Sequence, residues 1–159
     1  METPEPYREP ELPPEPERDV LVPLPAGIWG MGERVTSLAG LTLALSTFMS
    51  WYAGSGDGLT IAVIGWHTGL LGKLVFLIGL AIVALTVLRE LGVDLPATVP
   101  ESLVVIVLGS IATILVLIRL ISVPDEFFPY DGRGIGIWIA LLAALGLIVG
   151  GLLRAGEEL

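Results

Sequence analysis

Residues 102–121 read SLVVIVLGSIATILVLIRLI, twenty positions in which Arg119 is the only charged side chain. An α-helix of about 20 residues matches the roughly 30 Å hydrocarbon core of a bilayer. Apolar runs of similar length lie at about 35–52, 70–88 and 135–153. Backbone polar groups inside a bilayer must be paired within the protein, so runs of this length are expected to be helices. The sequence predicts an all-α membrane protein, a bundle of four transmembrane helices.

Composition agrees with this class and divides the chain into regions. Hydrophobic residues make up 53% of the chain and charged residues 16%, whereas soluble domains carry about 25% charged residues. Residues 1–34 hold eight of the seventeen acids and eight of the twelve prolines. Such a segment buries too little apolar surface to offset the entropy of ordering it. We therefore expect a disordered Pro/Glu-rich cytoplasmic tail at 1–33, a transmembrane domain at 34–155 and a short C-terminal tail at 156–159.

Several functional classes are disfavoured by what the chain lacks. It has no cysteine, one histidine and no basic cluster, so we expect no disulfide, no metal, no cofactor and no nucleic acid. None of the four apolar runs has an acid or a histidine near its centre, where proton-coupled transport would need one. The intramembrane hydroxyls have no base beside them in the sequence and are expected to bond back to their own or a neighbouring helix. We expect a non-enzymatic protein.

Basic residues predict the orientation. With four spans, both termini and the 89–101 link share one side, which holds Arg8, Arg18, Arg34, Arg89 and Arg154. The other side holds Lys73, Arg119 and Arg133. Five against three favours cytoplasmic termini by the positive-inside rule. The prediction is a multi-pass protein of the cell membrane.

Aromatic residues gather on the side opposite the termini, in the loops near 50–69 and 122–134. We expect these loops to pack together as a cap, and 59–64 to form a short strand, a hairpin or a re-entrant segment. The candidate interaction face comprises Trp51, Tyr52, Trp66, His67, Phe127, Phe128, Tyr130 and Trp138. Its expected partners are the bilayer and a membrane protein or a second copy of the chain.

Charged residues at the same interface are candidates for anchoring or for a ligand site. Lys73 and Arg119 lie about one turn inside their helices, where long side chains extend toward the interface. Arg119 is predicted to pair with Asp125 or Glu126. The candidate interfacial charges are therefore Lys73, Arg119, Asp125, Glu126 and Arg133.

Small residues spaced four apart predict close helix contacts, because lipid provides no hydrophobic drive for helix association. They are Gly40, Ala44, Gly109, Gly146 and Gly150. Both packing within one bundle and contact between copies fit this pattern.

Short motifs at 34–154 resemble those of the uncharacterised small four-helix membrane proteins of high-GC Gram-positive bacteria. They are Trp51-Tyr52, Gly65-Trp66, the run from Arg119 to Asp125, and the glycines of 132–136. The resemblance implies a topology and no assigned activity. We expect an accessory or scaffold protein that contacts a partner through its aromatic extracytoplasmic loops. The alternative is a small oligomeric transporter or channel.

Overall fold

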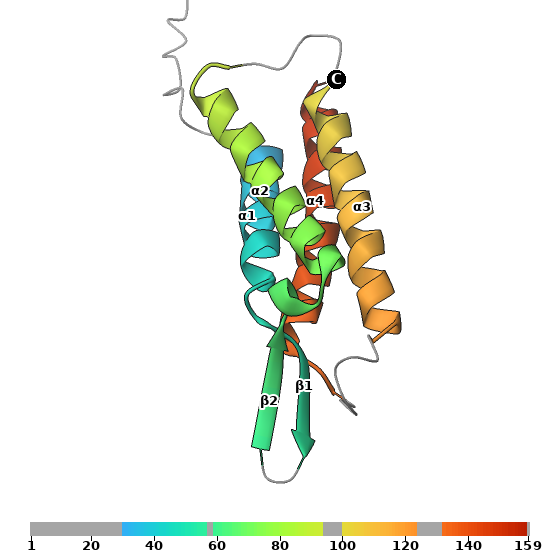
Figure 1. Cartoon of the computed structure of the whole chain (residues 1–159). Helices are drawn as coiled ribbons and strands as arrows, with labels where there is room; N and C mark the ends of the chain where they lie inside the picture. The colour runs from blue at the N-terminus through green and yellow to red at the C-terminus, as the bar shows by residue number, and fades with distance from the viewer. Residues whose placement is uncertain (1–29, 57–58, 94–99, 124–131, 159) are drawn as a thin grey trace, which may run out of the picture.

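The computed structural model describes residues 30–56, 59–93, 100–123 and 132–158. Four helices lie along one another, and a small β-sheet extends from one end of them (Figure 1). The helices are α1 (Met31–Ser46), α2 (Leu70–Glu90), α3 (Glu101–Ile121) and α4 (Ile135–Glu158). The sheet contains β1 (Ser50–Gly56), β2 (Leu59–Ile64) and β3 (Gly132–Arg133), and a short 3-10 helix, η1 (Gly65–His67), leads from β2 toward α2. The predicted tail lies almost entirely outside the described residues.

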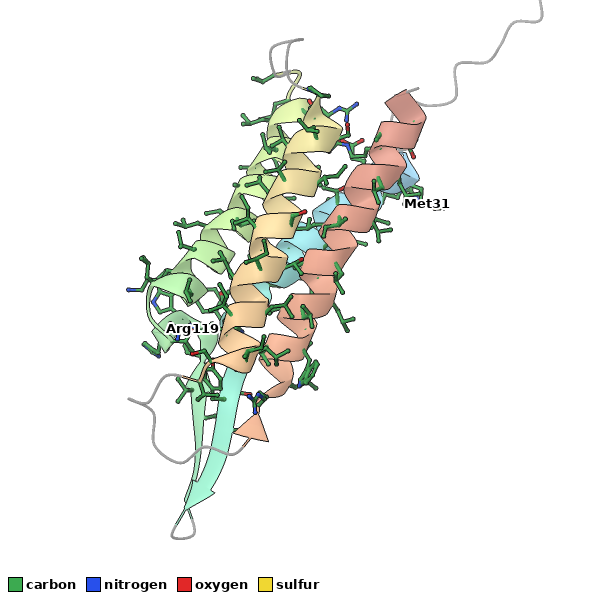
Figure 2. All side chains as sticks on the ribbon, turned by 90° about the vertical axis from the view of Figure 1, so that its right-hand side faces the viewer. Met31 and Arg119 are labelled. Carbon is green, nitrogen blue, oxygen red and sulfur yellow. The ribbon has the colours of Figure 1, made fainter. Side chains whose placement is uncertain are left out.

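Three of the helices are long and apolar enough to cross a membrane. They are α2, α3 and α4, whose most apolar windows have a mean hydropathy of 2.5 to 2.8. Side chains project outward from the helices (Figure 2). Many of the exposed ones are large and apolar, among them Leu77, Ile114 and Leu142. Exposed apolar surface on this scale is abnormal in water and ordinary in lipid. These features are consistent with a membrane protein.

Helix α1 differs from the predicted span at 35–52. It begins at Met31 and ends at Ser46, and its 16 residues extend about 24 Å, less than the bilayer core. The reason lies at its C-terminal end, where other segments bind the last carbonyls. The Trp51 indole donates to the Ser46 carbonyl at 2.9 Å, and the Trp66 backbone N–H donates to that of Thr47 at 2.8 Å. The chain therefore leaves the helix and enters β1.

The strand prediction for 59–64 is confirmed, because β1 and β2 form an antiparallel hairpin. The strand order is β2-β1-β3, so β1 is central and β2 is an edge strand. The register pairs Ala53 with Ala62 in β2 and with Gly132 in β3. Since β3 directly precedes α4, this sheet joins the loop after α1 to the start of the last helix.

The core of the helical domain is made of small and branched apolar residues. Gly40 of α1 and Gly79 of α2 allow the closest approach, because a Cβ on Gly79 would lie 2.7 Å from the Ala44 backbone nitrogen. Around these contacts lie fully buried residues such as Leu43 and Ile82. Three further predicted packing glycines also lie against other helices: Gly109 faces Leu147, Gly146 faces Ala39 and Gly150 faces Thr36. The backbones thus approach closely within one chain.

Candidate functional site

Trp51 fixes the sheet to the helices. Its side chain is fully buried, and its indole N–H reaches the Ser46 carbonyl at the end of α1. Gly65 of η1 packs against the indole so closely that an added Cβ would lie 2.5 Å from Cε2. The Trp51 carbonyl accepts a hydrogen bond of 2.7 Å from the Gly134 N–H just before α4. Trp51 is therefore a structural anchor and is absent from the exposed surface.

Tyr52 is the second anchor and connects β1 to α3. It is 1% exposed, and its hydroxyl donates to the Arg119 carbonyl at 2.7 Å. Burial raises the pKa of Tyr52 above its ordinary value of 10.0, and the positive charges of Arg119 and Arg133 oppose that rise. A neutral phenol at this position can donate its hydrogen bond at physiological pH.

Arg119 binds a backbone carbonyl of another segment. One Nη2 hydrogen is donated to the Thr68 carbonyl, just before α2, so the side chain links α3 to the beginning of α2. Its Nε is buried and has no partner among the described residues. The predicted acidic partners, Asp125 and Glu126, lie outside that part of the chain. Arg133 likewise binds backbone, donating to the Leu120 carbonyl at 2.8 and 3.0 Å.

The other described residues of the predicted face reach the surface to different extents. Trp138 is half exposed on α4, and His67 is exposed at the end of η1. Trp66 is partly buried in contact with two phenylalanine rings, Phe48 and Phe76, and Lys73 lies over its indole. Phe127, Phe128 and Tyr130 lie outside the described residues. The structure thus separates two buried anchors from a set of exposed side chains.

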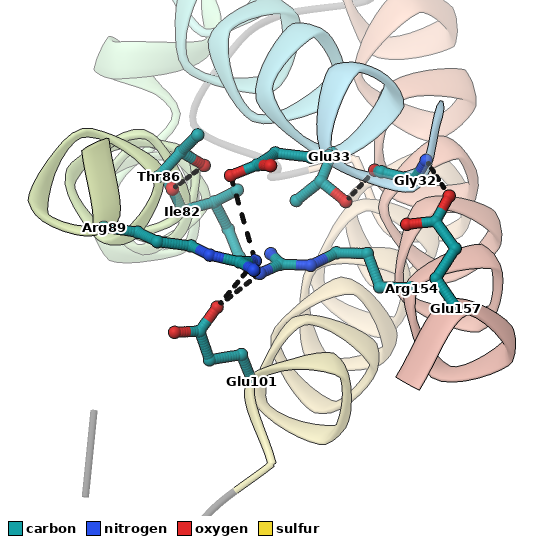
Figure 3. Close-up of polar contacts among 9 residues, drawn as sticks. Gly32, Glu33, Ile82, Thr86, Arg89, Glu101, Arg154 and Glu157 are labelled. Carbon is teal, nitrogen blue, oxygen red and sulfur yellow. Dashed lines mark hydrogen bonds and ion pairs between the residues drawn. The ribbon is translucent and has the colours of Figure 1, made fainter. Parts of the chain in front are cut away.

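A network of charges at the opposite end of the domain joins all four helices (Figure 3). It contains Glu33 of α1, Arg89 of α2, Glu101 of α3 and Arg154 of α4, hereafter the charge network. Glu101 accepts from both Arg154 and Arg89, the latter at 3.3 Å, and Arg89 lies 3.9 Å from Glu33. Glu157 adds a hydrogen bond of 3.2 Å from the Gly32 N–H in the first turn of α1.

Sequence reasoning missed this network. From the sequence, Arg89 and Arg154 indicate only the orientation and the ends of spans, and Glu33 and Glu101 have no predicted partner. A signal was present, because each of the four residues lies within about one turn of a helix end. Charges of opposite sign at ends that share one side of the membrane can pair across helices. The structure gives the network one buried member, Arg154, which is 5% exposed.

Hydroxyl groups in the helices serve their own backbone. Thr86, Ser110 and Thr113 each donate to the carbonyl four residues earlier at 2.8 to 3.0 Å. Ser46 and Thr47 do the same over three residues at the end of α1. These bonds confirm the expectation that they bond back to a helix. Within the described ranges, no group of three or more acidic or histidine side chains is placed to hold a metal ion.

Comparisons with known proteins add no relative: no family model matches the chain, and no curated protein or solved structure does so either.

Proposed function

We propose that this chain is a non-enzymatic membrane protein whose four-helix domain crosses the cell membrane and presents a small β-sheet to a partner protein. Its role would be that of an accessory or scaffold component. The observation that carries the proposal is the hairpin, which projects past the ends of the helices (Figure 1). The five-to-three excess of basic residues on the side of the termini supports a cytoplasmic charge network and an extracytoplasmic sheet.

Rigid attachment of the sheet supports a presenting role. Two buried aromatic residues, Trp51 and Tyr52, tie β1 to α1 and α3. The Gly134 N–H ties β1 to the start of α4 as well. A sheet held at three points keeps a constant orientation to the helices, which lowers the entropy lost when a partner binds.

The free edge of β2 supports strand addition as the mode of contact. β3 forms the opposite edge of the sheet, where it pairs with β1. It is only two residues long and contains the charged Arg133. β2 has six residues, LTIAVI, with no charge and no proline, and it pairs with β1 alone among the described strands. Soluble proteins protect edges of this kind with charges, prolines or bulges, because an unprotected edge recruits another strand. An extended, uncharged segment of a partner is the matching ligand.

The direction of the strands disfavours a second copy as that ligand. β1 and β2 run approximately along the helices (Figure 1), and therefore along the membrane normal in the proposed arrangement. An antiparallel β2–β2 pair has its two-fold axis perpendicular to the strands. Such an axis would insert one copy upside down. A different protein fits the edge better.

The test is retention of a partner by the native membrane complex. Ala62→Lys places a charge at an exposed position of β2, and Gly156→Lys is the matched control on α4, where an added Cβ meets nothing within 4 Å. Complexes are crosslinked in the native host, purified through the chain and identified by mass spectrometry. We expect the same partner with the unchanged chain and with Gly156→Lys, and its loss with Ala62→Lys. A partner set unaffected by Ala62→Lys would contradict docking at β2.

A flux assay in proteoliposomes tests the alternative of a small oligomeric transporter or channel. Apolar residues such as Ala112, Ala144 and Leu147 fill much of the buried centre of the domain. We expect flux no greater than that of empty liposomes. Saturable flux of an ion or solute would replace the scaffold proposal.

A further inference from the structure

Three aromatic rings meet on the flank of the domain, where α1 ends and α2 begins. Phe48 stacks on Trp66 with ring centroids 5.8 Å apart, and Phe76 meets both rings edge-on at 5.4 and 5.3 Å. Phe48 is 50% exposed, so the cluster reaches the surface. Together with Lys73, these residues are called the aromatic patch. It is separate from the edge of β2.

Lys73 gives the aromatic patch its charge. Its ammonium nitrogen lies 5.8 Å from the centroid of the Trp66 ring, within the range of a cation–π contact. The side chain is exposed, and no carboxylate of the described residues forms an ion pair with it. A π-face satisfies none of the three ammonium N–H donors. The cation is therefore held in place with its hydrogen-bonding capacity available.

The position of the patch along α2 points to lipid. Lys73 is in the first turn of a helix long and apolar enough to cross a membrane. Leu70, Leu74 and Leu77 are exposed on the same part of α2, and Leu74 and Leu77 lie further along the helix than Lys73. Tryptophan rings and lysine ammonium groups favour the headgroup level of a bilayer. A phospholipid offers both an anionic phosphate at the headgroup level and an acyl chain that can lie along the leucines.

We propose that the aromatic patch binds one anionic phospholipid, whose phosphate accepts hydrogen bonds from Lys73 and whose acyl chain lies along the exposed leucines of α2. Charge selects the lipid class, because a net negative headgroup complements an ammonium group that pairs with no carboxylate of the described residues. An acidic peptide would also complement the charge and would leave the adjoining leucines without a function. The proposal is independent of docking at β2.

Native mass spectrometry of the full-length chain, released from detergent and titrated with phosphatidylglycerol, tests this site. Phosphatidylcholine serves as the zwitterionic reference. We expect Lys73→Gln to weaken the tightest phosphatidylglycerol adduct about tenfold, as for loss of one charge-assisted hydrogen bond. Lys73→Arg should retain it. Arg34→Gln removes an exposed cation at the other end of the domain and should leave that adduct unchanged.

A second measurement locates the lipid independently of affinity. Phosphatidylglycerol brominated in its acyl chain should quench tryptophan fluorescence in nanodiscs, and Trp66→Phe should remove part of that quenching. Equal adducts for Lys73→Gln and Arg34→Gln would overturn the proposal. So would equal binding of the water-soluble headgroup glycerophosphoglycerol, because the site would then recognise phosphate without the acyl chain.

Discussion

Glu101 is the residue on which the charge network depends, so Glu101→Gln tests that network most sharply. The substitution keeps the size of the side chain and removes the charge that Arg154 and Arg89 share. Leaving one member of a buried pair without its partner costs about 3–5 kcal/mol. Glu101 retains 22% side-chain exposure, so the lower end of that range, about 3 kcal/mol, applies to Arg154. The exposed Arg89 pair adds less than about 1 kcal/mol.

The free energy of unfolding is measured in mixed micelles by titration with a denaturing detergent and followed by circular dichroism. Glu90→Gln is the matched control, because Glu90 is exposed at the end of α2 and its loss should change stability by no more than about 0.5 kcal/mol. Arg154→Gln alone should also be strongly destabilising. The double variant should lose less than the sum of the two single losses, because no unpaired charge remains in it. Equal stability of Glu101→Gln and Glu90→Gln, or strictly additive losses, would refute the reasoning.

Three further predictions concern the sheet end and the helix contacts. Trp51→Ala should cost about 3–5 kcal/mol, as truncations of buried aromatic residues do, whereas Trp138→Ala at a half-exposed ring should cost far less in the same unfolding assay. Gly40→Val should lower the free energy of unfolding by about 1–3 kcal/mol through overpacking, because an added Cβ would lie 2.7 Å from a methyl group of Ile82. Gly156→Val is the control for position, because an added Cβ there meets nothing within 4 Å. The raised pKa of Tyr52 means that above pH 10 the unfolded chain releases this proton before the folded chain does, so stability falls as pH rises further. This alkaline loss should be smaller in Tyr52→Phe, and an identical pH profile for both proteins would contradict the assignment.

The sequence predicts the long helices well because their signal is local. Apolar runs of about 20 residues bounded by charges and prolines place α2, α3 and α4 within a few residues of their observed ends. α4 is the least accurate at its C-terminal end, because its last turns carry Arg154 and Glu157. These residues extend α4 beyond its apolar run and bind α1 and α3, and composition cannot reveal such contacts.

The predicted end of the first span, at residue 52, was wrong because the apolar residues after Met49 belong to β1. Trp51 and Tyr52 continue the apolar run of α1 and so fit a transmembrane span. Their burial depends on contacts with Ser46, Gly65 and Arg119, which are distant in sequence or in another element. Hydropathy likewise cannot separate a buried aromatic anchor from an exposed one. The charge network was not predicted because it also depends on contacts between residues distant in sequence. Glu33 and Arg154 are 121 residues apart.

Opposite placement of the sheet and the charge network across the membrane is the central claim, and single-cysteine labelling tests it most directly. The chain has no native cysteine, so Ala62→Cys on β2, Gly156→Cys on α4 and Leu77→Cys in mid-α2 each give one reactive position. A membrane-impermeant maleimide applied to intact cells should label Ala62→Cys at once, Gly156→Cys only after permeabilisation, and Leu77→Cys in neither case. The reverse pattern would overturn the proposed orientation. Labelling of Ala62→Cys and Gly156→Cys from the same side would contradict the account itself.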